Sequence, residues 1–165
     1  NGLPPAKTES ILILSAPIIE FENFSEASPN IKPFPVPKKY LEQLSLGEEV
    51  IFILGMKNNS YIKFDAVDCT SITSLECGLG AGFGMHFGGN MTVRLDSING
   101  ELIGQTNINV PESEFISGYK IAAIPIIESE GIHDLYFTFT NPEYPDKDIG
   151  YLDFMKFKID KPNLP

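Results

Sequence analysis

Two stretches near the end of the chain, GIHDLYFTFTN at residues 131–141 and IGYLDFMKF at residues 149–157, decide the fold. In the first stretch Leu135, Phe137 and Phe139 alternate with polar residues. Successive side chains of a β-strand point to opposite faces of the sheet, so this alternation predicts a strand with one buried face. The second stretch is rich in the aromatic and aliphatic residues that strands favour.

The same period of two continues upstream and dominates the chain. In MTVRLDS, at residues 91–97, the apolar residues Met91, Val93 and Leu95 share one face. Further strands are expected at 16–24, 50–54, 60–67, 71–77, 83–87, 102–110, 119–127 and 149–159. Turn sequences such as SINGE and NPEYPDKD separate them at short intervals. The pattern predicts an all-β protein, a jelly-roll β-sandwich of two antiparallel sheets.

One segment has helical spacing instead. In PKKYLEQLSLGEE, Tyr40, Leu41 and Leu44 repeat at the helical period and precede Gly47, a residue that often ends helices. This predicts one short surface helix near residues 38–46.

The length and composition fit one domain. A chain of 165 residues with 42% hydrophobic residues can bury one real core and is too short for two ordinary domains. We expect a β-sandwich over residues 17–160, after a linker or processed N-terminus at 1–16 and before a C-terminal tail at 161–165. We expect the domain to be a monomer.

The charge limits the partners. A formal net charge of -10 repels nucleic acid and anionic membrane surfaces, which proteins approach with clustered Lys and Arg. The longest apolar run, ILILSAPII, is interrupted by Ser15 and Pro17 and falls short of the roughly 18–20 residues that span a bilayer. We therefore expect no nucleic acid, no membrane insertion, and a neutral partner.

The two cysteines, Cys69 and Cys77, are expected to be buried free thiols. If residues 72–77 are extended at about 3.3 Å per residue, the two Cα atoms lie beyond the roughly 7 Å that a disulfide tolerates. Cysteine usage therefore leaves the cellular compartment undecided.

The residues offer little support for catalysis. His133 shares a predicted strand face with Leu135 and is expected to be a core histidine, while His86 could reach a ligand but has no nucleophile near it in the sequence. The glycine run GLGAGFGMHFGGN at 78–90 lacks the spacing and following helix of a phosphate loop, which favours a tight crossing between strands. A sugar-hydrolase site made of two paired carboxylates stays an open alternative, because acidic residues are plentiful.

A possible metal pair begins the predicted sandwich. In EFE, strand alternation would place Glu20 and Glu22 on one face, roughly 6.6–7 Å apart at Cα, with Phe21 on the other. Two carboxylates so placed could hold Ca²⁺ with help from backbone carbonyls, although such a pair can also be a solvated strand face.

An ordered series of segments resembles family 6 carbohydrate-binding modules. The series consists of PIIEFENF (17–24), SYIKFDAVDCTSI (60–72), GGNMTVRLDSINGELIGQTNI (88–108), GIHDLYFTF (131–139) and YLDFMKF (151–157). Together the segments cover most of residues 17–159, in the order in which that family has them.

The resemblance implies a non-catalytic jelly roll that binds polysaccharide. Such modules are usually appended to secreted enzymes or larger extracellular proteins, so it implies a secreted, cell-surface or periplasmic location and a multidomain parent. It also implies a structural calcium held by Glu20, Glu22 and Asp153, which match the family's ligands. The ion would tie the first strand to the last.

The resemblance also places a sugar site at one end of the sandwich, but the residues there differ. The family grips a sugar between two aromatics and orients it with an asparagine. Here Asn58 lies in GMKNN, where the first ring would fall, Phe115 lies near the second, and Tyr151 takes the asparagine position. With Tyr144 these residues could form a rearranged platform, or the rings could simply close the core.

Three functions therefore stay open. The first is a module that binds neutral oligo- or polysaccharides. The second is a structural or protein-interaction module that kept the fold and lost the sugar site, and the third is a small jelly-roll glycoside hydrolase. An open aromatic cleft near Phe115 and Tyr151 would favour the first, and a plugged end the second. The segment from about Ser25 to Glu49 is expected to cover or rebuild this end.

Overall fold

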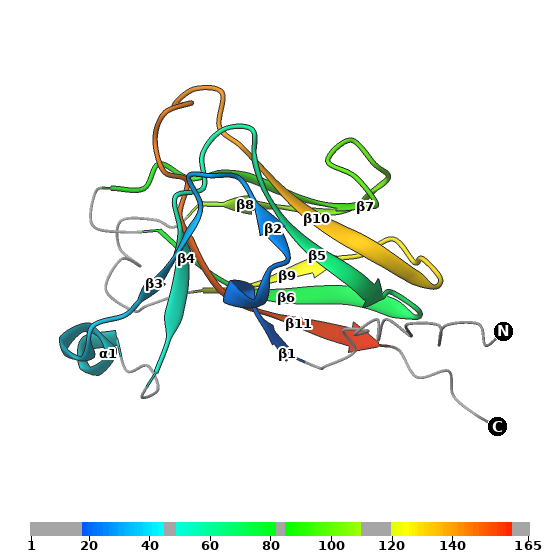
Figure 1. Cartoon of the computed structure of the whole chain (residues 1–165), viewed down its shortest axis with the longest axis horizontal. Helices are drawn as coiled ribbons and strands as arrows, with labels where there is room; N and C mark the ends of the chain where they lie inside the picture. Colours follow the sequence, from blue (N-terminus) through cyan, green and yellow to red (C-terminus); the bar gives the residue numbers. More distant parts are fainter. Residues whose placement is uncertain (1–17, 45–48, 82–84, 110–119, 160–165) are drawn as a thin grey trace, which may run out of the picture.

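The computed structural model describes residues 18–44, 49–81, 85–109 and 120–159. Two antiparallel sheets pack face to face (Figure 1). Among these residues no helix is both long enough and apolar enough to cross a membrane. The predicted all-β sandwich is confirmed.

One sheet has five strands in the order β2-β5-β10-β7-β8. The strands are β2 (Glu26–Ala27), β5 (Ser60–Asp68), β7 (Gly89–Leu95), β8 (Leu102–Ile108) and β10 (Ile132–Thr140). The predicted alternation holds along β10, where Leu135, Phe137 and Phe139 are buried and the residues between them are half-buried.

The other sheet has six strands, with β3-β4-β11-β6-β9 in order and β1 beside β11. The strands are β1 (Ile18–Glu20), β3 (Lys32–Pro35), β4 (Ile51–Leu54), β6 (Ile72–Gly80), β9 (Lys120–Pro125) and β11 (Tyr151–Ile159). β11 pairs with β4 at Leu152 and with β1 from Phe154 onward, so it changes neighbour close to Asp153. Its register against β6 also shifts between Leu152 and Met155.

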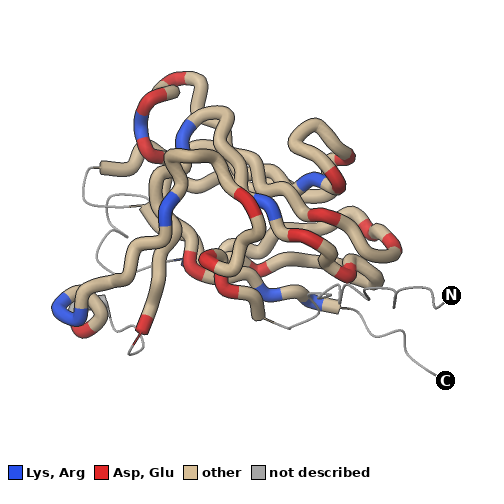
Figure 2. Tube along the Cα trace, viewed as in Figure 1, with Lys and Arg blue, Asp and Glu red and all other residues tan. Residues whose placement is uncertain are grey.

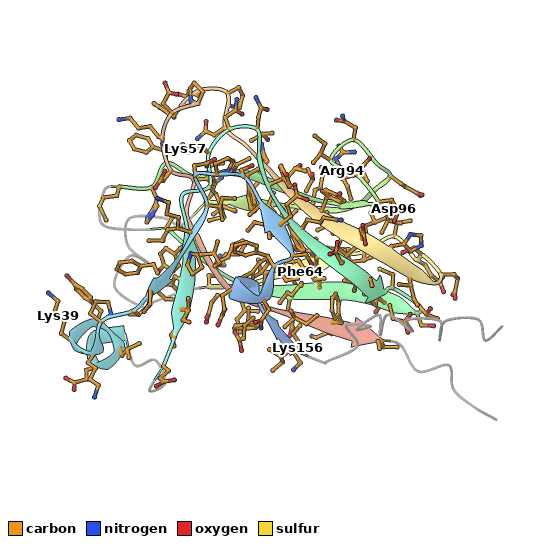
Figure 3. The ribbon with its side chains drawn as sticks, in the orientation of Figure 1. Lys39, Lys57, Phe64, Arg94, Asp96 and Lys156 are labelled. Atoms are coloured by element: carbon orange, nitrogen blue, oxygen red, sulfur yellow. The ribbon has the colours of Figure 1, made fainter. Side chains whose placement is uncertain are left out.

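Aromatic rings fill the space between the sheets. Phe21, Phe64 and Phe137 are fully buried and pack edge to face, with ring centroids 5.1–5.9 Å apart. Phe64 is labelled in the interior in Figure 3. This geometry adds about 0.5–1.5 kcal/mol per ring pair to the area that the rings bury.

The predicted helix is present as α1 (Lys38–Leu44), and residues 45–48, which include Gly47, lie outside the described part. With β3 and β4 it forms an arm beside the sandwich, at the lower left of Figure 1. Strand β3 was not predicted, because its sequence, KPFP, contains Pro33 and Pro35, which weaken a strand pattern.

Two predicted strands are wrong in part. Residues 16–24 were expected to be extended throughout, but Phe21–Asn23 form the 3₁₀ helix η1, since the chain turns there from the six-stranded sheet toward β2. Residues 83–87 were also expected to be a strand. Residues 82–84 lie outside the described part, and His86 makes only an isolated bridge to Asp148.

The cysteine prediction is confirmed, and the histidine prediction is wrong. Cys69 and Cys77 are buried free thiols. His133 is half-buried, outside the core, and lies near the start of β10, where the register against β5 shifts because β5 has one extra residue. Its side chain is 25% exposed and pairs with the carboxylate of Asp96, with Nδ1 2.9 Å from Oδ2.

Candidate functional site

An open cleft of about 450 Å³ lies beside the arm, at the β3–β4 edge of the six-stranded sheet. The arm supplies one wall, which is made of apolar and aromatic side chains from β3, β4, α1 and the link between β3 and α1: Phe34, Val36, Tyr40, Phe52 and Leu54. Val36, Leu41, Phe52 and Tyr151 pack as a small hydrophobic cluster of their own. The segment that was expected to rebuild this end of the sandwich therefore forms the wall of a cleft.

The opposite wall is formed by Met85, His86 and Tyr151. Tyr151 is only 6% exposed, and its ring stacks on Phe52 with centroids 4.5 Å apart and an interplanar angle of 28°. The His86 ring meets Tyr151 edge to face at 5.7 Å. Burial, and after it the charge of Asp153, raises the pKa of the Tyr151 phenol, so the phenol stays neutral.

Tyr151 fits here because β6 has a glycine beside it. Tyr151 is paired with Gly80, and a Cβ on Gly80 would overlap the tyrosine ring. Gly78 stands in the same relation to the ring of Phe154. Part of the glycine run noted in the sequence is therefore explained as space for rings on the neighbouring strand, which agrees with the predicted tight crossing.

Two exposed rings, which we call the rim, lie next to the cleft along the chain, because one of them, Phe87, directly follows the cleft-lining His86. Phe87 and Tyr144 are 42% and 41% exposed, and their centroids are 5.0 Å apart. The Lys147 ammonium lies 5.6 Å from the centre of the Phe87 ring. The backbone N–H of Phe87 donates to the carbonyl of Asp148 at 2.8 Å, which fixes this ring beside the 141–150 loop. This loop is at the top left of Figure 1.

Asn58 holds that loop in place. Its Oδ1 accepts a hydrogen bond from the backbone N–H of Asn141 at 3.0 Å. The Asn141 side chain in turn donates to Gly88 and accepts from the backbone N–H of Tyr144. Asn58 thus positions Tyr144 indirectly. The neighbouring Lys57 is labelled at this end in Figure 3, and Lys39 is labelled on α1.

A second, acidic hollow lies next to the cleft. Glu20, Glu22 and Asp153 line it together with Glu49, Val50 and Ile51 at the start of β4, and with Ile18 and Phe154. Figure 2 shows acidic residues gathered around η1 and the adjoining part of β11. The 3₁₀ turn leaves Phe21 in the core and both glutamates outside it, so the predicted division of the EFE side chains holds although the predicted strand does not.

Burial and mutual repulsion act on the carboxylates of the acidic hollow. Burial and the neighbouring charge of Glu22 raise the pKa of Glu20. Glu22 Oε2 is buried and has no hydrogen-bond partner, and Asp153 is only 7% exposed. A buried carboxylate oxygen without a partner fits the place of a cation ligand. The side chains do not close into a compact metal cluster of three or more ligands anywhere in the described ranges.

Another aromatic pair lies on the outer face of the five-stranded sheet. Tyr61 and Tyr136 have centroids 6.1 Å apart. The polar groups around them pair with one another: Lys63 Nζ is 2.6 Å from Asp65 Oδ1 and 2.9 Å from Asp134 Oδ2, and the Tyr61 hydroxyl donates to Glu26. This face therefore leaves fewer polar groups for a ligand.

The predicted site residues are partly brought together. Tyr151, Tyr144 and Asn58 lie at one end of the sandwich, and Phe115 lies outside the described residues. The sequence reasoning missed Phe34, Phe52 and Phe87, which form walls and rim, and Glu49 of the acidic hollow. The sequence signal for these rings was the phenylalanine in each of KPFP, VIFIL and MHFGG. The sequence does not show that β3 pairs with β4, so it did not indicate that the three rings lie near one another.

Neither a protein-family profile nor a curated protein matches this sequence. Solved structures do match. A family 6 carbohydrate-binding module from Clostridium cellulolyticum, solved in complex with xylose, is 22% identical with a TM-score of 0.67, over 86% of this chain and 95% of that chain. A β-1,3-glucan-binding module of this family from Bacillus halodurans is 17% identical with a TM-score of 0.68, over 86% of this chain and 94% of that chain.

Two other matches are a longer enzyme and a module of another family. A glycoside hydrolase family 43 arabinoxylan arabinofuranohydrolase from Bacillus subtilis, in complex with cellotetraose, matches over 86% of this chain but only 27% of its own, with 18% identity and a TM-score of 0.66. A family 36 module in complex with calcium and xylotriose is 14% identical with a TM-score of 0.51, over 86% of this chain and 98% of its own. At these identities the comparisons establish the fold, that of family 6 carbohydrate-binding modules.

Proposed function

We propose that this chain, which has the fold of family 6 carbohydrate-binding modules, is a non-catalytic module that binds neutral oligo- or polysaccharides. The observation that carries the proposal is the pair of exposed rings, Phe87 and Tyr144, beside the open aromatic cleft. A module that had lost its sugar site would have a flat or plugged end instead.

The rim of the cleft supplies the chemistry of sugar recognition. The C–H faces of a pyranose pack on an aromatic ring, and the exposed Phe87 and Tyr144 offer two rings side by side. Lys147 and the backbone of the 141–150 loop stand next to them as hydrogen-bonding groups for hydroxyls. Tyr151 forms part of the wall, and Asn58 acts through its hydrogen bond to the loop.

The acidic hollow is proposed to hold a structural Ca²⁺. Glu20, Glu22 and Asp153 would hold it, and Glu49 lies close enough to the same hollow to contribute. The ion would supply positive charge beside the buried Glu22 Oε2, which has no hydrogen-bond partner, and beside the partly desolvated Glu20, and it would tie the β1–η1 corner to β11.

The setting of the module follows from the same argument. Chains of this fold occur as free-standing modules and as part of a longer hydrolase among the solved structures. We propose that residues 17–160 form one monomeric, secreted module, with 1–16 as linker and 161–165 as tail, in a larger extracellular protein.

Calorimetric titration with xylo-, cello- and β-1,3-gluco-oligosaccharides in the presence of calcium tests the function. We expect binding at millimolar concentration or below, and a loss of about tenfold in affinity for Tyr144→Ala, because one ring of the rim is removed. Tyr136→Ala, on the outer sheet face, is the matched control and should bind as the wild type does.

Two outcomes would overturn parts of the proposal. If the folded, calcium-loaded protein binds none of these sugars, the structural or protein-interaction alternative is favoured. Release of reducing sugar would instead favour the hydrolase alternative and contradict the non-catalytic function.

A further inference from the structure

The interior of the cleft differs chemically from its rim. Its volume of about 450 Å³ is in the range of ordinary small-molecule sites. Its described lining contains no carboxylate, amide, Lys or Arg side chain, and its polar groups are limited to the hydroxyls of Tyr40 and Tyr151 and the His86 ring. In a chain with a net charge of -10, the described lining of this hollow contains no acidic or basic side chain other than His86.

A sugar ring is poorly matched to this interior. A pyranose carries hydroxyls around its edge, and each one that is buried without a hydrogen-bond partner costs free energy. Charged groups are excluded for the same reason, since nothing in the described lining could neutralise them. The interior therefore suits a neutral and apolar group.

The walls favour an aromatic group in particular. Phe52 and Tyr151, one from each wall, stack on each other. Phe34 is 43% exposed on the edge strand, and Met85 is 62% exposed. Aromatic rings gain from stacked and edge-to-face contacts with other rings, and methionine sulfur packs well against them.

The cleft and the rim are continuous along the chain. His86 lines the cleft, and the next residue, Phe87, belongs to the exposed ring pair with Tyr144. Residue 148 bridges to His86 and accepts the Phe87 backbone hydrogen bond, so both residues are held by the same loop. The exposed ring pair therefore begins one residue away from the cleft lining.

We propose that the cleft binds the aromatic substituent of an aryl-substituted neutral sugar while the sugar ring lies on Phe87 and Tyr144 at the rim. This inference rests on the proposed carbohydrate-binding function and specifies its ligand class: a sugar that carries a neutral aromatic ether or ester group.

The test compares phenyl and methyl β-glycosides of xylose, glucose and cellobiose by calorimetry on the full chain with calcium, with free phenol as a third ligand. The phenyl glycoside should bind about tenfold tighter than its methyl counterpart, because the ring buries apolar surface in the cleft. In saturation-transfer NMR, the phenyl protons should receive the strongest signal.

Two variants separate the cleft from the rim. Phe34→Ser removes a ring from an exposed edge-strand position and should bring the phenyl-to-methyl affinity ratio close to one. Tyr144→Ala should weaken both glycosides by the same factor and leave the ratio unchanged. Thermal melting confirms that each variant is folded.

The outcomes distinguish this inference from the proposed function. Methyl and phenyl glycosides that bind equally well would overturn the inference and leave the function standing. Free phenol that binds as tightly as the phenyl glycoside would overturn both, because the sugar would contribute nothing. Absence of binding by every glycoside would also overturn both.

Discussion

Tyr151 and Asp153 stand two positions apart on β11 and line two different hollows. The first lines an apolar cleft whose other wall comes from the arm of β3, β4 and α1. The second lines an acidic hollow at the place where β11 exchanges β4 for β1 as its neighbour. The same pair of strands, β4 and β11, supplies residues to both.

The difference lies in what each hollow needs to be stable. The apolar cleft depends on shape, because Tyr151 fits only over a glycine and against Phe52. The acidic hollow depends on charge, because its carboxylates are partly desolvated and repel one another. Steric changes should therefore act on the first and ionic conditions on the second.

The largest effect is expected from Gly80→Ala. The added Cβ would overlap the Tyr151 ring, and both sit in paired strands, so the sheet must deform at a cost of about 3 kcal/mol in unfolding free energy. Urea denaturation measures this. In a Tyr151→Ala background the same substitution should cost much less, and an equal cost there would contradict the steric explanation.

Calcium removal is expected to have the second-largest effect on stability. A ligand that binds only the folded state at about 100 times its Kd adds about 2.7 kcal/mol, so a chelator should lower the Tm by about 5–10 °C. Glu22→Gln, which alters the buried carboxylate without a hydrogen-bond partner, should remove most of this shift. Glu26→Gln, outside the hollow, is the control, and an undiminished shift in Glu22→Gln would rule this site out.

The pH dependence of the calcium-free protein should give a smaller effect. The pKa of Glu20 is raised in the folded state, so the folded protein holds the proton more tightly than the unfolded one. The stabilisation is complete below the unfolded pKa and is lost as the pH rises through the folded pKa. Glu20→Gln should flatten this slope in chelator, and saturating calcium should flatten it in the wild type. A slope that survives in Glu20→Gln would have another origin.

The smallest effect is expected far from both hollows, at the His133–Asp96 pair. The hydrogen bond to Asp96 raises the pKa of His133, and the bond to the Glu130 carbonyl acts in the same direction. This stabilisation is therefore present below the unfolded histidine pKa and lost as the pH rises through the folded pKa. For a pair this exposed, about 0.5 kcal/mol is at stake. His133→Asn should abolish that part of the pH profile in chemical denaturation and leave the Glu20 part unchanged.

The sandwich and the helix could be predicted because they depend on local patterns, whereas the grouping of Glu20 and Glu22 with Asp153 was predicted only from the resemblance to family 6 carbohydrate-binding modules. Period-two alternation identifies β10 without reference to any other strand. Glu20 and Glu22 lie outside the core, as predicted, although η1 replaces part of the expected strand. The reason is that Phe21 is large and apolar and takes the core position.

The cleft could not be predicted, because it depends on contacts between distant segments. Phe34 lies in a proline-containing strand with no alternation of burial, and its partner Phe52 is recognised only from the pairing of β3 with β4. The burial of His133 was predicted wrongly for a similar reason: alternation within GIHDLYF does not show that the imidazole pairs with Asp96 of a distant segment and stays half-buried.

The prolines of β3 have a consequence for association. β3 is the edge strand of the six-stranded sheet, and it exposes Phe34. Since β3 pairs with β4 throughout its length, Pro33 and Pro35 are tolerated only with their ring nitrogens facing away from the ladder. The outer edge therefore lacks two amide donors, and a strand from another copy cannot complete a ladder there. The exposed Phe34 side chain at this edge therefore does not lead to edge-to-edge aggregation.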